Sequence, residues 1–272
     1  MAEVSEGAKN HSVVDLINPD ASGFVVLVCE HASNFIPEKY QNLGLDRAAL
    51  QSHIAWDPGA LALSKILSRR LNAPLVAQKI SRLVYDCNRP GDAVSAIPAR
   101  SEVWDIPGNA ELSDIDRQAR IDGVYAPFSN ALDRLLQSRM DAGIPTNIVT
   151  VHSFTSVFNN KPRDVDVGIL HDEDTRMADA LLQECSGESA YRVRRNQPYG
   201  PEDGVTHTLR EHALSRGLPN VMLEIRNDLV GDQTAQTRMA DWLVPRINAA
   251  LDTVSGAQEN FPLIREMTGG HH

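Results

Sequence analysis

The sequence predicts an α/β fold, with a mixed, mostly parallel sheet and helices on both of its faces. Short β-branched apolar runs recur along the chain, and several are separated by stretches whose apolar residues have helical spacing. The run Val25–Val28 is continuously apolar, which is typical of a strand covered on both faces. With 272 residues and 42% hydrophobic content, the chain is long enough to bury a large core.

The apolar runs and the helical spacing predict individual elements. Strands are expected over residues 24–30, 75–80, 147–152, 165–170 and 219–225. Helices are expected over residues 58–71, 113–140 with interruptions near Gly123 and Pro127, 174–185, 205–215 and 234–251. Asp57 and Pro58 suit the N-cap and first position of the first of these helices.

Proline and glycine mark the irregular parts of the chain. Residues 89–113 and 194–204 are expected to form long loops, and we expect the first of them near the mouth of the functional site. We expect a flexible N-terminal segment over residues 1–20, a single catalytic domain over 21–262 and a C-terminal tail over 263–272. His271 and His272 in that tail are not counted as site residues.

Composition excludes several classes of function. The chain has 26 Lys and Arg against 36 Asp and Glu, a formal charge of -10 and a pI near 5.3, the wrong sign for a protein that binds nucleic acid or anionic membranes. No segment has the roughly 20 apolar residues that cross a bilayer, and the start of the chain lacks a signal peptide. Three widely spaced cysteines, Cys29, Cys87 and Cys185, predict a reducing cytoplasm.

Two histidines follow or end apolar strands, which is where α/β enzymes place reacting groups. These are His31 and His152, and imidazole is a common ligand of catalytic metals. A hydrolytic metal site needs a third ligand, for which Glu30, Asp57 and Asp86 are candidates. Glu30 is the weaker choice because neighbouring residues on a strand point to opposite faces. Asp57 could equally cap the helix that follows it.

A carboxylate and several cations complete the candidate site. Glu224 lies in an apolar run, where a carboxylate is costly unless it is paired or functional, and we predict that it is a general base. The alternative is a structural ion pair with Arg226. Arginine and asparagine side chains suited to binding a carboxylate are concentrated in the segment 81–90, at Arg82, Asn88 and Arg89.

Other residues of reactive types are expected to be structural. The remaining histidines lack paired metal spacing and should be surface or packing residues, namely His11, His53, His171, His207 and His212. Cys29 is expected to face the core rather than to act as a nucleophile. The sequence also contains no serine-nucleophile elbow, dinucleotide fingerprint or phosphate loop.

Five motifs in order along the chain resemble the N-formylglutamate amidohydrolase family. They are Cys29-Glu-His-Ala-Ser-Asn-Phe-Ile-Pro37, Asp57-Pro-Gly-Ala60, Ser81-Arg-Leu-Val-Tyr-Asp-Cys-Asn-Arg-Pro90, Val151-His-Ser-Phe154 and Leu223-Glu-Ile-Arg-Asn-Asp-Leu229. The resemblance implies a cytoplasmic amide hydrolase of histidine catabolism that binds one zinc ion. It also implies a phosphorylase/hydrolase-like fold similar to that of the zinc carboxypeptidases.

The resemblance assigns roles to individual residues. It implies that His31 and His152 are zinc ligands, that Asn88 and Arg89 hold a substrate carboxylate, and that Glu224 is the base. The carboxypeptidase pattern has a glutamate three residues after the first histidine, where this chain has Asn34, and Asp57 is taken as the acidic ligand instead.

The expected reaction is hydrolysis of N-formyl-L-glutamate to formate and L-glutamate, with Arg82 or Arg226 as further carboxylate contacts. The first motif departs from the Pro-His-Ser-Gly of the histidine-degrading members, so the chain resembles a sister branch. One alternative is a zinc deacylase or peptidase that acts on another N-acyl-amino acid. A second is a non-catalytic protein that binds a small carboxylate without a metal.

Overall fold

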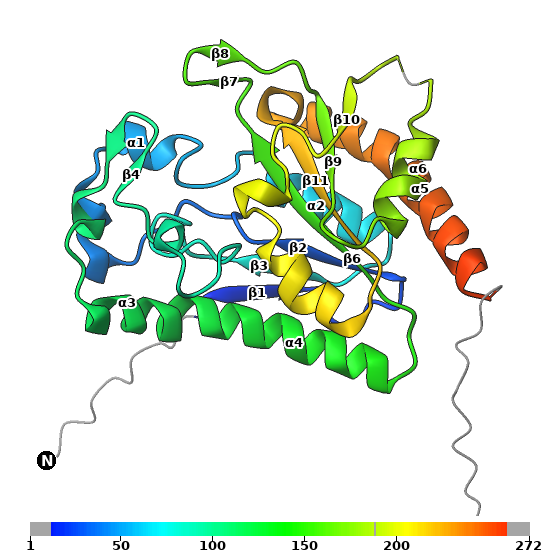
Figure 1. Cartoon of the computed structure of the whole chain (residues 1–272), viewed down its shortest axis with the longest axis horizontal. Coiled ribbons are helices and arrows are strands. Elements are labelled where there is room, and N and C mark those ends of the chain that lie inside the picture. Colours follow the sequence, from blue (N-terminus) through cyan, green and yellow to red (C-terminus); the bar gives the residue numbers. More distant parts are fainter. Residues whose placement is uncertain (1–11, 188, 260–272) are drawn as a thin grey trace, which may run out of the picture.

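A seven-stranded sheet forms the centre of the protein, for which we obtained a computed structural model that describes residues 12–187 and 189–259 (Figure 1). The strand order is β1-β3-β2-β6-β11-β9-β10. Four of the six neighbouring pairs are parallel, and the pairs β1/β3 and β11/β9 are antiparallel. The predicted α/β class and its mixed, mostly parallel sheet are therefore confirmed.

All five predicted strands are present in this sheet. Its strands are β1 (Val14–Ile17), β2 (Val25–Cys29), β3 (Leu75–Gln78), β6 (Asn147–Phe154), β9 (Val167–Leu170), β10 (Val193–Arg195) and β11 (Asn220–Arg226). Two small hairpins lie outside it: β4 (Arg100–Ser101) with β5 (Trp104–Asp105), and β7 (Val157–Phe158) with β8 (Lys161–Pro162). Strand β1 corrects the prediction of a flexible segment over 1–20, because it pairs with β3 along its whole length.

Helical structure is present in every segment predicted to be helical, and the short helix α1 (Arg47–Gln51) was not predicted. The other α-helices are α2 (Ala60–Arg70), α3 (Asp114–Arg120), α4 (Ala126–Asp141), α5 (Arg176–Glu184) and α6 (Gln233–Glu259). A π-helical turn, Ile121–Tyr125, joins α3 to α4 where the interruption was predicted. The helix predicted over 205–215 is present as a helical segment over 207–216, but most of it is a π-helical turn, Leu209–Ala213, and a 3₁₀ turn, Leu214–Arg216.

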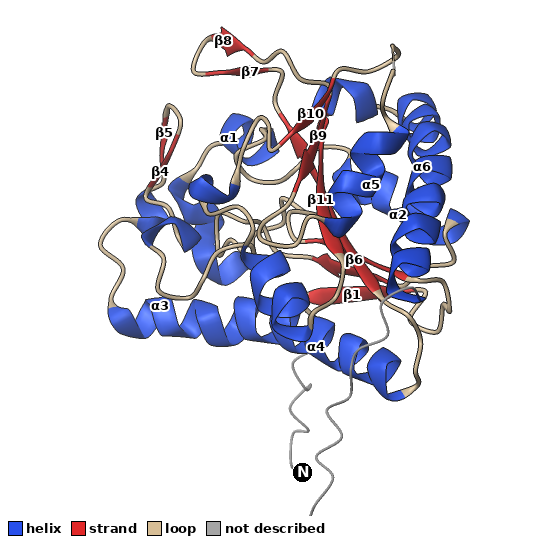
Figure 2. Cartoon of the chain, turned by 45° about the vertical axis from the view of Figure 1, so that its right-hand side comes forward, coloured by secondary structure: helices blue, strands red, loops and turns tan. Residues whose placement is uncertain are grey.

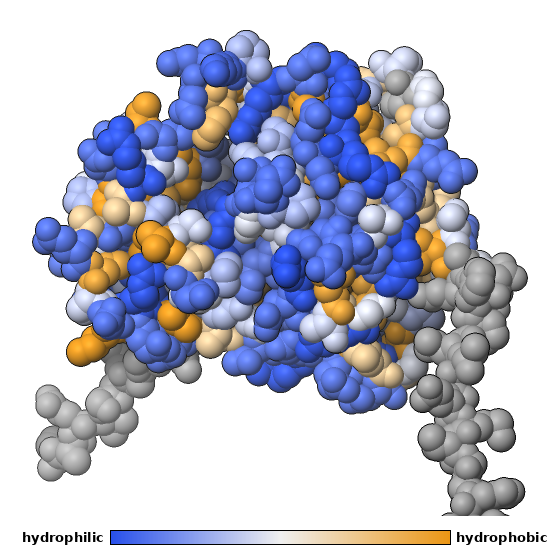
Figure 3. Space-filling model, in the orientation of Figure 1, coloured by the Kyte–Doolittle hydropathy of each residue, from blue (hydrophilic) through white to orange (hydrophobic). Residues whose placement is uncertain are grey.

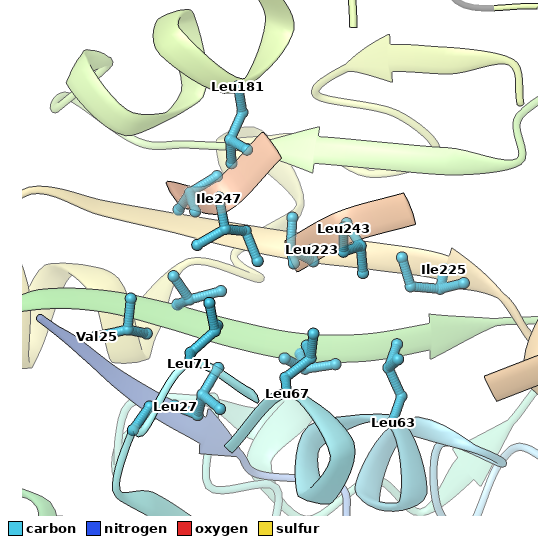
Figure 4. Packing of buried hydrophobic residues seen from close by; sticks show 14 of the residues in the cluster. Val25, Leu27, Leu63, Leu67, Leu71, Leu181, Leu223, Ile225, Leu243 and Ile247 are labelled. Carbon is cyan, nitrogen blue, oxygen red and sulfur yellow. The ribbon is translucent and has the colours of Figure 1, made fainter. Parts of the chain in front are cut away.

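Side chains from the two faces of the sheet enter separate hydrophobic cores. On β2, Val25 and Leu27 pack with residues of α2, α5 and α6, whereas Val26 and Val28 pack with residues of α4. Figure 2 shows α2, α5 and α6 on one side of the sheet and α4 on the other, and Figure 4 shows Leu63 and Leu67 of α2 against the first core. This arrangement buries both faces of the central strands, as their continuous apolar sequence predicts.

The turn that leads into α2 leaves Asp57 available to the site. The N-cap of α2 is Gly59, which has a left-handed conformation with φ of 84° and makes no side-chain capping bond. The prediction that Asp57 caps this helix is therefore wrong. Its carboxylate turns away from the helix toward the ends of the central strands.

Some predictions fall on residues that lie outside the described parts of the chain. They include His11, the expected tail over 263–272 and its two histidines. Among the helices that are described, none combines the length and the apolar character needed to cross a membrane.

Candidate active site

The candidate site lies at the carboxyl ends of the central parallel strands. His31 follows the end of β2, His152 is near the end of β6, and Glu224 is near the end of β11. His152 and Glu224 occupy paired positions on the neighbouring strands β6 and β11. Ligands of open α/β sheets bind at such strand ends.

Three side chains converge there on one point. The Nδ1 atoms of His31 and His152 are 3.1 Å apart, and they lie 3.3 Å and 2.9 Å from Oδ2 of Asp57. The possible ligand atoms of the three residues all lie within 4.8 Å of one another. All three side chains are buried, and the backbone N–H of Ser153 also donates to Asp57. Asp57, which the sequence analysis proposed as the acidic ligand, thus lies beside both histidines.

Each histidine has a carboxylate at its other ring nitrogen. Nε2 of His31 is 2.7 Å from Oδ1 of Asp86, and Nε2 of His152 is 3.1 Å from Oε2 of Glu30. Glu30 and Asp86 are therefore neighbours of the two histidines rather than members of the convergent group. Both rings direct Nδ1 toward the same point.

Arg82 connects the acids of this centre. Its guanidinium donates to Asp86 at 2.6 Å and to Asp57 at 3.5 Å. Four buried carboxyl groups belong to the centre, those of Glu30, Asp57, Asp86 and Glu224, and Arg82 is bonded to two of them. Arg82 thus serves first to balance these acids, although it also lines the cavity.

The donor set fits a divalent metal ion such as zinc. Two imidazole nitrogens and one carboxylate oxygen form a common type of catalytic zinc site, which leaves a position open for water or substrate. The excess of buried carboxyl groups favours a cation at this point, because buried charges require compensation. His31, Asp57 and His152 are the residues that could hold the ion.

The acids of the site differ in their pKa values. Burial raises the pKa of Glu224 to about 7, because it outweighs the nearby His152, which lowers that pKa. Burial would also raise the pKa of Asp57, but His31 and His152 hold it well below its usual range. Oε2 of Glu224 is buried and accepts no hydrogen bond within the described residues. Glu224 can therefore take up a proton near neutral pH, whereas Asp57 stays ionised.

A cavity of about 470 Å³ opens beside these groups. Its wall includes His31, Asp57, His152 and Glu224, together with Arg89 and Asn88. The side chain of Asn88 is held by two bonds: it accepts from the backbone N–H of Thr208 and donates to the carbonyl of Val205. An amide nitrogen carries two hydrogens, so Asn88 has a second donor for a ligand in the cavity.

The predicted cations occupy different positions. Arg89 lines the cavity and donates through Nη1 to the carbonyls of Asn88 and Gly204, and its planar guanidinium carries further donors. Arg226 lies outside the cavity wall, where it forms ion pairs with Asp166 and Asp228. These ion pairs explain why Arg226 does not pair with Glu224, although the two side chains belong to the same strand.

The loop over 89–113 forms part of the mouth of the cavity, as predicted. Its lining residues are Ser95, Pro98, Arg100, Ser101 and Glu102. His53 also lines the cavity and pairs with Glu102 at 2.8 Å, which corrects its assignment as a surface or packing residue. The molecular face in Figure 3 is mainly hydrophilic, with small separate apolar patches.

An aromatic part of the cavity wall could not be predicted from the sequence. Phe154, Phe158 and Tyr199 all line the cavity, and the guanidinium of Arg163 lies over their three rings at 5.5, 4.6 and 4.7 Å. These residues come from the end of β6, the β7–β8 hairpin and the segment after β10. Only the fold brings them together. They give the cavity an apolar part of its wall, in addition to the part that carries the acidic side chains.

The fold and the site define an α/β protein with a buried histidine–carboxylate centre of the kind used in hydrolysis. The chain belongs to the N-formylglutamate amidohydrolase family, whose sequence profile matches residues 24–231. It is accordingly an amidohydrolase.

The solved structures that resemble the chain include two proteins. One is gene product Atu2144 from Agrobacterium tumefaciens, which is 51% identical, with a TM-score of 0.88 over 90% of this chain and 96% of that one. The other is N-formylglutamate amidohydrolase from Ralstonia eutropha JMP134, which is 17% identical, with a TM-score of 0.56 over 92% of this chain and 100% of that one. The second similarity shows a shared fold. No functionally curated protein matches the sequence.

Proposed function

We propose that the protein is a zinc-dependent amidohydrolase that cleaves the amide bond of an N-acylated amino acid. The substrate we propose first is N-formyl-L-glutamate, which would yield formate and L-glutamate. The observation that carries the proposal is the convergence of His31, Asp57 and His152 beside Glu224. The motif carrying Glu224 and the motifs carrying the three candidate ligands all fall within the segment that matches the family.

His31, Asp57 and His152 would hold the metal, which supplies Lewis-acid polarisation of the acyl carbonyl and makes water more acidic. Glu224, which lines the cavity, accepts a proton from the attacking water at its carboxylate. It then delivers that proton to the nitrogen of the leaving amine, so that the carboxylate returns to its starting state. A pKa near 7 suits a group that both accepts and donates a proton at neutral pH.

Arg89 and Asn88 bind the carboxylate of the substrate in this proposal. A guanidinium can hold a carboxylate through two parallel hydrogen bonds, and the remaining amide hydrogen of Asn88 can donate a third. This contact fixes the position of the scissile amide beside Glu224, so it contributes orientation rather than proton transfer. Arg226 is not included, because it lies outside the cavity wall and pairs with Asp166 and Asp228.

The aromatic wall favours a second candidate substrate class. Phe154, Phe158 and Tyr199 offer an apolar surface that the side chain of glutamate does not need. An N-acyl-amino acid with a larger acyl group or an apolar side chain would use this surface. The chemistry is the same, and the two candidates differ only in which substrate gives the higher kcat/KM.

A panel of substrates tests the proposal. Zinc-loaded protein should release formate from N-formyl-L-glutamate, and formate and free amine should appear in equal amounts. N-acetyl-L-glutamate, N-formyl-L-leucine and N-formyl-L-phenylalanine test the second candidate. If zinc-loaded protein hydrolyses none of these substrates but binds them, the non-catalytic alternative replaces the proposal.

We also propose a cytoplasmic location. The three cysteines are buried, and no disulfide joins them in the described part of the chain, as expected in a reducing compartment. Hydrolysis of N-formyl-L-glutamate would further place the enzyme in histidine catabolism. The substrate panel decides this point, because the assignment depends on that substrate alone.

A further inference from the structure

Glu30 is a fully buried carboxylate that the proposed reaction does not use. It directly follows β2, has no exposed surface and does not belong to the cavity wall. Its Oε2 lies 3.1 Å from Nε2 of His152, on the side of the ring that faces away from Asp57. A carboxylate in such a position is strongly destabilising unless a charged or polar partner compensates it.

The contact joins Glu30 to the ring nitrogen that does not face the centre. The two atoms are within ion-pair distance, but their alignment falls short of hydrogen-bond geometry. Contacts of this kind in ligand-free sites are often poorly aligned and tighten when the site is filled. Thr208, whose hydroxyl helps to lower the pKa of Glu30, is buried as well.

The two nitrogens of an imidazole ring are linked in their chemistry. When Nε2 carries a hydrogen and donates it to a carboxylate, Nδ1 of the same neutral ring keeps a lone pair for a metal. Nδ1 of His152 is the atom that lies beside Asp57 and His31. A carboxylate at Nε2 therefore selects the tautomer that can bind a metal, and it also fixes the orientation of the ring.

We propose that Glu30 is a positioning residue that orients His152 and holds it in the tautomer that binds the metal. The inference depends on the metal site of the proposed function, but it concerns a residue that contacts neither metal nor substrate. Two further observations support it. Glu30 approaches His152 from the end of the neighbouring strand β2, so the contact also fixes the end of β2 against β6 at the site. Glu30 is adjacent to His31 in the sequence, so the same turn of the chain positions the proposed ligand His31 and the carboxylate that contacts the second proposed ligand, His152.

Metal affinity tests this role without relying on turnover. Glu30→Gln keeps the shape of the side chain and removes its charge, and we expect the zinc Kd, measured by competition with a chromogenic chelator, to rise about 10- to 100-fold. The absorption spectrum of the cobalt-substituted protein should change as well, because the orientation of a ligand has changed. Glu30→Asp retains the charge but is shorter, and we expect an intermediate Kd.

Asp133→Asn is the matched control. Asp133 also pairs with a histidine nitrogen, Nδ1 of His212 at 2.8 Å, but neither residue belongs to the cavity wall. This variant should leave the zinc Kd and the cobalt spectrum unchanged. Zinc binding by Glu30→Gln with the wild-type Kd and spectrum would overturn the inference and leave the proposed function intact. If Glu30→Gln does not fold, the same measurements on Glu30→Asp decide, and a wild-type Kd and spectrum would overturn the inference. Absence of zinc from the wild-type protein would instead refute the proposed function itself.

Discussion

Glu224 lies directly beside His152, at paired positions on two parallel strands, and the carboxylate of Asp57 approaches the same histidine from a loop. The strand pairing fixes the spacing of the proposed base and the proposed metal ligand through the backbone of the sheet. Both side chains are therefore held by central strands of the sheet. This relationship underlies the predictions that follow.

Replacing Glu224 with glutamine should abolish most of the activity without releasing the metal. The amide cannot accept a proton from water, and loss of a general base lowers kcat by about 10²- to 10⁴-fold. Formate release and the zinc content of the same sample provide the measurement. Glu173→Gln, at an exposed position away from the cavity, should behave as wild type. Full activity in Glu224→Gln would show that another group is the base.

The same variant should stabilise the metal-free protein at high pH. The pKa of Glu224 is raised from 4.5 in the unfolded chain to about 7 in the folded protein, so its ionisation opposes folding as pH rises, by about 3 kcal/mol above pH 7. Glu224→Gln removes this effect. In urea unfolding with a chelator present, its free energy of unfolding should exceed that of wild type by about 1 kcal/mol at pH 5 and about 3 kcal/mol at pH 8. A difference that is the same at both pH values would contradict the assigned pKa.

Arg89 should determine affinity for the substrate carboxylate. Arg89→Leu removes a charge-assisted contact of about 2 kcal/mol, which corresponds to roughly a 30-fold loss in kcat/KM, mainly through KM. Arg89→Lys should lose less. The comparison is with N-formyl-L-glutamine α-amide, which has no carboxylate and should be hydrolysed equally by wild type and Arg89→Leu. An equal loss on both substrates would assign Arg89 a structural role.

The β7–β8 hairpin should depend on Arg163. Its guanidinium stacks on Phe154, Phe158 and Tyr199, and Arg163→Gln removes these contacts, with an expected loss of about 1 kcal/mol in the free energy of unfolding. Amide hydrogen exchange over 157–162 should become faster. Arg194→Gln, an exposed arginine on β10 that contacts none of these rings, is the control. Unchanged exchange in Arg163→Gln would mean that the hairpin is held by other contacts.

The sheet could be predicted because its central strands are continuously apolar. The edge strand β1 was missed because it lacks this apolar character. Only one of its four residues, Val14, is buried, so its sequence resembles that of a loop. The segment over 205–215 was predicted as an α-helix from its spacing. The segment is helical over 207–216, and backbone groups at its start, the carbonyl of Val205 and the N–H of Thr208, hold Asn88, a tertiary contact that local sequence does not encode.

The positions of His31, His152 and Glu224 at the candidate site could be predicted because each lies in an apolar strand or just after one. The partners of the histidines could not, since Asp86 is 55 positions from His31 in sequence, and only the fold brings them together. For Glu30 the alternation of strand residues correctly separates it from His31. It gives no indication that the carboxylate reaches His152, because that contact crosses between two strands.

The metal content of the purified protein tests the central claim most directly. Elemental analysis after dialysis against zinc and removal of excess ion should give about one zinc per chain for wild type, and much less for His152→Ala, which lacks one of the three convergent ligands. His171→Ala, at a histidine outside the cavity wall, should retain the wild-type content. A wild-type chain without stoichiometric zinc, or zinc retained in full by His152→Ala, would contradict the account.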